Sequence, residues 1–484
     1  MFLFSRLLIQ VERSQDVKQY FGYELTPMPT SLFNCHGMRK SNKSSLAALL
    51  TKDVEVNTDK LEESHKVIDG GALLHRIHWK LGVPYKIVIQ QYVIYVQQHY
   101  GIATIVFDGY RQGPSTKDAE HARRAKRVSA QISISPEVIV HGSQHAILSN
   151  KFNKAQFIDM LMVALRHEGH EVYQSTADAD NMIAQKALES ASNGMPTIVE
   201  SDDTDVLVLL IHHFNEEMSN IFFRSELSKR SRSGIRFYSI SEIVRSIGSI
   251  VTRHILFIHA WSGCDTTSAT FGQGKGVILK KMESSEELQS LSEIFMCESA
   301  TPEDISSAGE RIFVIMYSGK NEETLNSLRY TRYLNLLATS KRTLRPEMLP
   351  PTDRAAHYHS LRVHLQILKW KDLNDIRNDQ AIDWGWKREK SHLMPVMTDK
   401  EPAPSDILKI IRCRCKRSCT TMCSCKKNGL KCVKACLNCQ GESCDNIECD
   451  MDDNFLNELD EELDSEDNSN QVHRCRNIFE TFDF

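Results

Sequence analysis

The first candidate chemistry in the sequence is a set of aspartates that follow short apolar runs. Asp69 ends the run in "HKVIDGG", and Asp108 ends the run in "IATIVFDG". Asp203 and Asp205 come directly after a third run, in "TIVESDDTDVLVL". Crowded carboxylates repel one another unless a cation neutralises them, and hard divalent cations prefer oxygen ligands. The pattern therefore indicates a divalent-metal site, provided that the fold brings these side chains together.

The secondary-structure elements around these aspartates must bring their side chains together. Apolar runs alternate with helix-like stretches such as "PYKIVIQQYVIYVQQHYG", "NKAQFIDMLMVALRHEGH" and "DADNMIAQKALESAS". This alternation predicts an α/β fold with a mostly parallel sheet flanked by helices. In such sheets, sites form beyond the C-terminal strand ends, where these aspartates lie. The alternative is that each aspartate only begins a turn or caps a helix, as aspartate often does.

A later stretch, "HAWSGCDTTSATFGQGKG", adds another acid next to a glycine-rich turn. Asp265 precedes two threonines, and Gly272, Gly274 and Gly276 surround Lys275. Glycines allow a backbone to approach a phosphate closely, and exposed N–H groups with a lysine supply positive charge. Taken alone the stretch is ambiguous, because glycine turns that contain a lysine are common.

Composition limits the classes of protein that remain. The 484 residues are enough for roughly two to four domains, and 41% of them are hydrophobic, so a core can be buried. The net charge of −4 excludes a polycation, so any nucleic-acid surface must be a local basic patch. There is no apolar run of about 18 residues and no clear signal peptide, so we expect no membrane contact and a location inside the cell, in the nucleus.

Nine of the 14 cysteines lie in one short stretch, "CRCKRSCTTMCSCKKNGLKCVKACLNCQGESC". Such density inside the cell is typical of metal binding rather than of disulfides. The spacing resembles half of a tesmin-type CXC domain, whose nine cysteines bind three zinc ions. Three separate four-cysteine sites would need twelve ligands, so three bridging thiolates must close the gap. The expected zinc ligands are Cys413, Cys415, Cys419, Cys423, Cys425, Cys432, Cys436, Cys439 and Cys444.

Five segments in order resemble the flap-endonuclease type of 5′ nuclease, within the PIN-like superfamily. They are "VIDGG", "VFDG" with the basic stretch after it, "DADNMIA", "SDDTDVLVL" and "GCDTTSATFGQGKG", and they span roughly residues 60–285. The resemblance implies hydrolysis of phosphodiester bonds with two Mg²⁺ or Mn²⁺ ions. The metal-binding and catalytic acids that it implies are Asp69, Asp108, Asp178, Asp180, Asp203, Asp205 and Asp265.

The same resemblance implies two contacts with nucleic acid. The glycine-rich turn corresponds to a helix–two-turn–helix element that grips duplex DNA backbone, through Gly272, Gly274, Lys275 and Gly276. The basic stretch after Asp108 resembles the start of a helical arch, which places Lys117 and Arg124 near phosphate-steering positions. The alternative for this stretch is a solvated helix held by ion pairs such as Glu120 with Arg124.

The sequence departs from the family in two places. Asp178 and Asp180 stand where the family usually has glutamates, and more than 60 residues precede Asp69, where the family begins close to its first strand. We therefore divide the chain into an N-terminal extension without assigned chemistry (1–60), a PIN-like nuclease domain (61–345), a connector (346–408), the CXC zinc module (409–449) and an acidic tail (450–484). In the connector, Trp384 and Trp386 are expected to pack.

The leading hypothesis is a divalent-metal-dependent, structure-specific DNA nuclease that a zinc module tethers to DNA. Basic residues between the cysteines favour contact with phosphates, and DNA is a better candidate than RNA. The alternatives are a DNA-binding or chromatin-associated protein that has lost catalysis, and a PIN-like ribonuclease. The combination of the two modules also resembles multiplied animal proteins suspected of a mobile-element origin.

Overall fold

The computed structural model describes most of the chain up to residue 446. The described ranges and positions are 17–52, 54, 63–109, 115–117, 130–176, 179–225, 236–339, 344–373, 381–390, 392–405, 413–416, 419–427, 431–432, 436–441, 444 and 446. Asp178, Arg124, most of the basic stretch after Lys117 and the acidic tail lie outside them. Within the described residues, no helix is both long and apolar enough to cross a membrane.

A six-stranded sheet forms the centre of the molecule, in the order β5-β4-β3-β6-β7-β8. The first five strands in this order are parallel, and β8 is antiparallel to β7. This arrangement confirms the predicted α/β class. The strands are β3 (His65–Asp69), β4 (Ala103–Phe107), β5 (Glu171–Gln174), β6 (Thr197–Glu200), β7 (Ile221–Ser225) and β8 (Arg236–Ser239).

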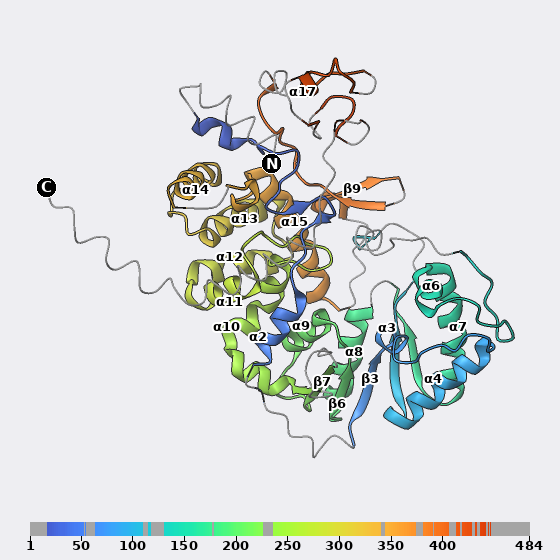
Figure 1. Cartoon of the computed structure of the whole chain (residues 1–484). Coiled ribbons are helices and arrows are strands. Elements are labelled where there is room, and N and C mark those ends of the chain that lie inside the picture. Colours follow the sequence, from blue (N-terminus) through green and yellow to red (C-terminus); the bar gives the residue numbers. More distant parts are fainter. Residues whose placement is uncertain are drawn as a thin grey trace.

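Helices cover both faces of the sheet, because strand residues alternate in direction. Ile68 and Ile105 pack with α4 (Tyr85–Tyr100) and α7 (Lys151–His167) in one hydrophobic cluster. Their neighbours Val67 and Val106 belong to a second cluster on the other face. That cluster includes α8 (Ala179–Ser192), α9 (Thr204–His213) and α10 (Ile240–Trp261). Figure 1 shows α4, α6 and α7 on the opposite side of β3 from α9 and α10.

The apolar run after the "SDDTD" turn forms the helix α9 rather than a further strand. Its residues from Thr204 to Ile211 are all buried. A helix that is buried on every side carries no polar stripe, so its sequence lacks a 3.6-residue period. Asp203 caps its N-terminus by accepting the backbone N–H of Asp205.

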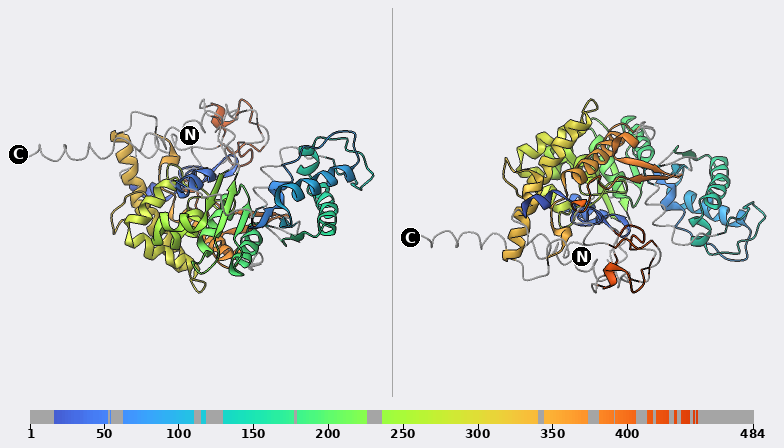
Figure 2. Two further views of the ribbon diagram at one scale, coloured as in Figure 1. Left: turned by 90° about the horizontal axis from the view of Figure 1, so that it is seen from below. Right: turned by 90° about the horizontal axis from the view of Figure 1, so that it is seen from above.

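A helical layer follows the sheet in the sequence and packs beside it (Figure 2). Its members are α11 (Lys275–Ser284), α12 (Glu286–Met296), α13 (Pro302–Met316), α14 (Leu325–Thr339) and α15 (Asp353–Lys371). The segment that we expected to be a connector contains α15, which packs against α10 and α13 and contributes to the main core. Trp386, in the β9 (Trp386–Glu389) and β10 (His392–Pro395) hairpin, is buried in the same core. Residues 353–373, 386–390 and 392–395 are therefore part of the body.

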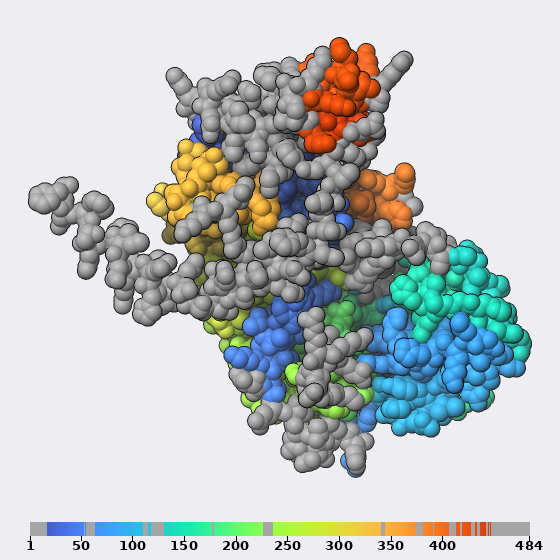
Figure 3. Space-filling view, viewed as in Figure 1, coloured from blue at the N-terminus to red at the C-terminus, as the bar shows by residue number. Residues whose placement is uncertain are grey.

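The N-terminal segment also belongs to the body. It contains η1 (Lys18–Gly22), β1 (Phe33–Asn34), β2 (Gly37–Met38) and α2 (Lys43–Leu50). Leu32 and Leu46 are fully buried in the main core, and part of the segment (dark blue) is visible at the surface in Figure 3. The remaining short elements are α3 (Gly70–Leu73), α6 (Gln144–Ser149), η2 (Pro346–Met348), η3 (Ala381–Trp384) and α17 (Ser424–Lys427).

Candidate metal centre

The parallel strands bring the predicted acids to one edge of the sheet. Asp69 ends β3, Asp108 follows β4, and Asp203 lies just beyond β6. Because these three strands are adjacent and parallel, their C-terminal ends meet. Side-chain oxygens of Asp180, Asp203 and Asp205 lie within 4.8 Å of one another. The edge therefore carries a carboxylate cluster, to which Asp265 is joined as described below.

Asp69 both caps a helix and belongs to this cluster. Its Oδ1 accepts the backbone N–H groups of Gly71 at 2.8 Å and Ala72 at 3.1 Å, and its Oδ2 accepts the Ser201 hydroxyl at 3.1 Å. Burial, with a smaller contribution from the charge of Asp108, raises the pKa of Asp69 to about 6, although these hydrogen bonds oppose the shift. The cap and the site are alternatives at the level of sequence, but they are compatible here, because Asp69 caps α3 and still lies beside Asp108.

Asp203 and Asp205 have opposite electrostatic surroundings. Burial, followed by the charge of Asp205, raises the pKa of Asp203 to about 7. Burial alone would also raise the pKa of Asp205, but Lys43 and the hydrogen bond from His259 lower it below its usual range. The distance between His259 Nε2 and Asp205 Oδ1 is 2.7 Å, and both side chains are buried. Asp205 is thus held as a carboxylate by fixed protein donors.

Lys43 connects Asp265 to the cluster. Its Nζ lies 3.0 Å from Asp205 Oδ2, 3.1 Å from Asp265 Oδ1 and 3.7 Å from Asp203 Oδ1. Burial would lower the pKa of Lys43, but the charges of these carboxylates raise it above its usual range. We assigned no chemistry to residues 1–60, and no motif in that segment marks this lysine.

Two further lysines border the cluster. Lys117 Nζ lies 3.5 Å from Asp180 Oδ2, so this predicted phosphate-steering residue stands at the edge of the acidic group. Lys154, on α7, has its Nζ 3.7 Å from Asp108 Oδ2 and was not predicted. Of the other predicted residues, Asp178 and Arg124 lie outside the described part of the chain.

The glycine-rich turn lies beside the cluster, but Lys275 points inward. Gly272 is exposed with a φ of +67°, and Gly274 is the N-cap of α11. Gly276 lies in the first turn of this helix and is half-buried. The Lys275 side chain is only 2% exposed, and its Nζ lies 3.0 Å from His259 Nδ1 and 2.9 Å from the carbonyl oxygen of Gly263. Our expectation that its ammonium group contacts a phosphate was therefore wrong.

Instead, Lys275 begins a series of buried polar contacts that runs through His259 to Asp205. Burial lowers the pKa of Lys275 to about 7 and that of His259 to about 4. A neutral His259 that accepts from Lys275 at Nδ1 can donate its Nε2–H to Asp205. The chain fixes the orientation of this carboxylate, a role that sequence spacing could not reveal.

The cluster fits a divalent cation of the hard type. Its donors are carboxylate oxygens, which Mg²⁺ and Mn²⁺ prefer. Burial is the main cause of the raised pKa values of Asp69 and Asp203, and a neighbouring carboxylate adds to each shift; a bound cation would favour both charged forms. Asp180, Asp203 and Asp205 are the residues that could share one ion.

The cysteine segment forms a second candidate metal centre. Its nine predicted ligands are not joined by disulfide bonds. The Sγ–Sγ distances are 3.7 Å for Cys413–Cys419, 3.9 Å for Cys413–Cys432, 3.8 Å for Cys423–Cys432 and 3.7 Å for Cys425–Cys436. Tetrahedral zinc with Zn–S bonds of about 2.3 Å would place its sulfurs about 3.8 Å apart. The described thiols are thus spaced as zinc ligands.

The same cysteines recur in several possible sites. Among the described residues, four sets of four thiols lie close enough to hold a metal ion. Cys413 and Cys432 each belong to three of these sets, whereas Cys415, Cys425 and Cys444 each belong to one. A thiolate that bridges two zinc ions must belong to two sites, and these overlapping sets meet that requirement.

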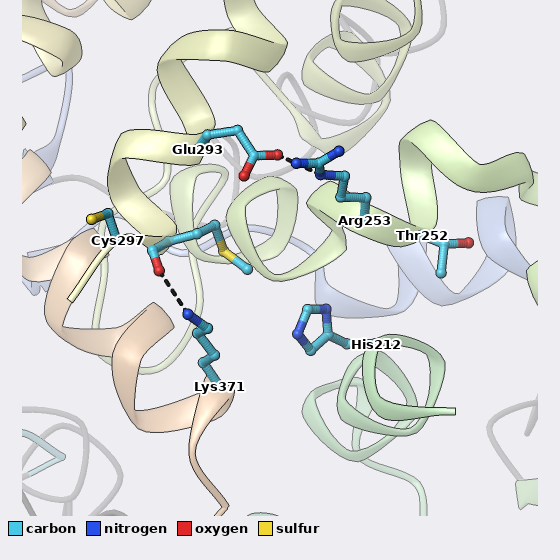
Figure 4. Close-up of a pocket in the computed structure, with 7 residues that line it drawn as sticks. His212, Thr252, Arg253, Glu293, Cys297 and Lys371 are labelled. Carbon is cyan, nitrogen blue, oxygen red and sulfur yellow. Dashed lines mark hydrogen bonds and ion pairs between the residues drawn. The ribbon is translucent and has the colours of Figure 1, made fainter. Parts of the chain in front are cut away.

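A surface pocket is lined by residues of α9, α10, α12 and α15 and by Cys297 (Figure 4). His212, near the C-terminal end of α9, lines it, whereas Asp205 is at the other end of that helix. Arg253 Nε pairs with Glu293 Oε1 at 2.6 Å, and Lys371 Nζ donates to the carbonyl oxygen of Met296 at 3.1 Å. The carboxylates of the cluster do not line this pocket.

Comparisons with known proteins find similarity in structure only. The catalytic core of Rad2 in complex with DNA substrate aligns over 63% of this chain and 81% of its own, at 14% identity and a TM-score of 0.34. The bacteriophage T5 D15 flap endonuclease, in complex with DNA and metal ions, aligns over 66% and 91%, at 12% identity and a TM-score of 0.31. The Holliday junction-resolving enzyme GEN1, in complex with product DNA and Mg²⁺, aligns over 53% and 49%, at 13% identity and a TM-score of 0.26. No protein-family model and no curated protein sequence matches the chain.

Proposed function

We propose that the chain is a divalent-metal-dependent, structure-specific nuclease that hydrolyses phosphodiester bonds in DNA. The observation that carries this proposal is the convergence of six aspartates at one sheet edge. They come from five separate segments and are Asp69, Asp108, Asp180, Asp203, Asp205 and Asp265. Lys43, Lys117 and Lys154 offset only part of this negative charge, so a bound cation would stabilise the cluster.

In this proposal the residues of the cluster have different roles. Asp180, Asp203 and Asp205 would hold a divalent ion, which when bound supplies activation of water and polarisation of the phosphate. His259 fixes the orientation of Asp205, and Ser201 fixes that of Asp69. Lys117 stands beside Asp180, where its charge would attract a phosphate backbone.

The cysteine segment completes the proposal as a zinc-bound tether to DNA inside the nucleus. Basic side chains lie between its ligands, and Arg414, Lys416, Lys426 and Lys431 are exposed. Exposed cations contribute to affinity for any phosphate backbone through the release of counterions. We propose about three zinc ions here, from the nine thiols and their shared sets.

Labelled flaps, hairpins and duplexes of DNA and of RNA, incubated with Mg²⁺ or Mn²⁺, test the activity. We expect cleavage of DNA that Asp203→Ala and Asp265→Ala each reduce at least about 100-fold, because each removes charge from the reacting centre. Asp159→Ala is the matched control, since this exposed aspartate on α7 lies outside the cluster. Binding of DNA without cleavage would contradict the proposal and favour a non-catalytic binder, and cleavage of RNA alone would favour a ribonuclease.

A further inference from the structure

The positive charge inside the carboxylate cluster comes from the N-terminal segment. Lys43 is the first residue of α2, and it lies at least 160 residues before each of the carboxylates that it contacts. Its Nζ lies within 3.7 Å of Asp203, Asp205 and Asp265, and its side chain remains 24% exposed. The ammonium group thus lies among the carboxylates, on a side chain that is only partly buried.

The fold fixes the position of this lysine. The Ser41 hydroxyl donates to the carbonyl oxygen of Gly263 at 2.8 Å, and the Thr204 hydroxyl donates to the carbonyl oxygen of Lys43 at 3.3 Å. Leu46 and Leu50, farther along α2, are buried in the main core. The segment is therefore an integral wall of the site, and Lys43 is not carried on a mobile arm.

Asp205 already has a protein donor on each carboxylate oxygen. His259 Nε2 lies 2.7 Å from Oδ1, and Lys43 Nζ lies 3.0 Å from Oδ2. A divalent ion about 2.1 Å from Oδ2 could lie no farther than about 5 Å from the Lys43 ammonium. Sites with two divalent ions hold them about 3.5–4 Å apart. The ammonium group can thus lie about as far from the first ion as a second ion would, and it would repel a second ion placed beside it.

We infer that Lys43 takes the place of a second divalent cation, so that the cluster binds one such ion with a fixed ammonium group beside it. This inference rests on the proposed function. The family resemblance implies two divalent ions, whereas this inference predicts one divalent ion and one lysine. The lysine would then face the phosphate and neutralise part of its charge in the way that a second ion does.

The number of bound Mn²⁺ ions tests this inference without recourse to cleavage. Full-length, zinc-loaded protein is titrated with Mn²⁺, and bound ions are counted by electron paramagnetic resonance and by calorimetry. We expect the unmodified chain to bind one Mn²⁺ ion and the Asp180→Asn variant to bind none. The Lys43→Met variant should bind two. Lys43→Arg, which keeps the charge, should bind one, and so should Lys52→Met, which replaces an exposed lysine just beyond α2.

Two Mn²⁺ ions in the unmodified chain would overturn the inference, whatever the variants do. A folded Lys43→Met that still binds one ion would overturn it as well, and Lys43→Gln provides a second neutral variant if the first unfolds. If no bound Mn²⁺ is sensitive to Asp180→Asn, the proposed function itself fails. This last result differs from the two that reject only the role of Lys43.

Discussion

At the residue scale, buried polar groups tie the glycine-rich turn to the carboxylate cluster. Lys275, at the start of α11, contacts His259, which in turn contacts Asp205. Each link is buried and therefore shielded from the water that would weaken it. A shift of the turn would thus change the position of a carboxylate in the cluster.

His359 gives a prediction about pH at the same scale. It lies on α15, is fully buried, and packs with ring centroids 5.0 Å from Trp261 and 5.5 Å from Phe313. Burial, followed by the charge of Arg362, lowers its pKa to about 3. The folded chain therefore binds this proton more weakly than the unfolded chain, so stability is lost as the pH falls below about 6.5.

Replacement of His359 by Phe should remove this dependence. The free energy of unfolding is measured by urea denaturation at pH 7.5 and at pH 5. The loss between the two should be about 2 kcal/mol smaller in His359→Phe than in the unmodified chain. His99→Phe, at an exposed position of α4, is the control. An unchanged loss in the His359 variant would contradict the prediction.

At the element scale, α13 and α15 pack closely because a glycine lies at their contact. A Cβ added to Gly309 would overlap Ser360 Oγ and lie 2.7 Å from Ser360 Cβ. Gly309→Ala should therefore lower the free energy of unfolding by about 1–3 kcal/mol, since the helices must separate. Thermal or urea denaturation measures the change.

Gly276→Ala is the matched control for that variant, because it also places a methyl group on a helical glycine. The new Cβ would meet only Leu49 Cδ1, at 3.6 Å, which is an ordinary contact. Alanine favours a helix over glycine by up to about 1 kcal/mol, so this variant should be neutral or more stable. Equal destabilisation of both variants would show that the close approach at Gly309 is not the cause.

The sequence predicted the elements whose patterns are local. Short β-branched runs and amphipathic helices such as α7 have clear periods, so the parallel sheet and the strand-end aspartates Asp69 and Asp108 followed from them. By contrast, α15 is buried over most of its surface although it contains His359, Arg362 and His364. Its sequence has no apolar stripe, so the sequence alone predicts a connector here.

The lysines of the site escaped prediction for a different reason. Lys43 and Lys154 lie in segments without a motif, and they meet the acids only through tertiary packing. Lys275 is the opposite case, because its glycine neighbours predict an exposed cation and the side chain is buried. Its burial follows from the acceptors around it, including the carbonyl oxygen of Gly263, which spacing along the chain does not encode.

At the scale of the whole molecule, the cysteine segment gives a prediction about zinc. Elemental analysis should find about three zinc ions per chain. Cys432 belongs to three of the four described sets of thiols, so Cys432→Ser should lose at least two ions. Cys444, which is similarly buried, belongs to one set, so Cys444→Ser should lose at most one. Equal losses in the two variants, or about one zinc ion in the unmodified chain, would contradict a shared-thiolate cluster.

The core that joins the N-terminal segment to α15 has a consequence for how the protein is made. Leu32 and Phe33 leave the ribosome early, whereas Leu361 and Val363, which complete the same core, follow more than 300 residues later. Domains generally fold as units during synthesis, so these early apolar side chains must wait for their partners. A message that stopped before α15 would yield a chain with an open core, which chaperones and proteases would remove.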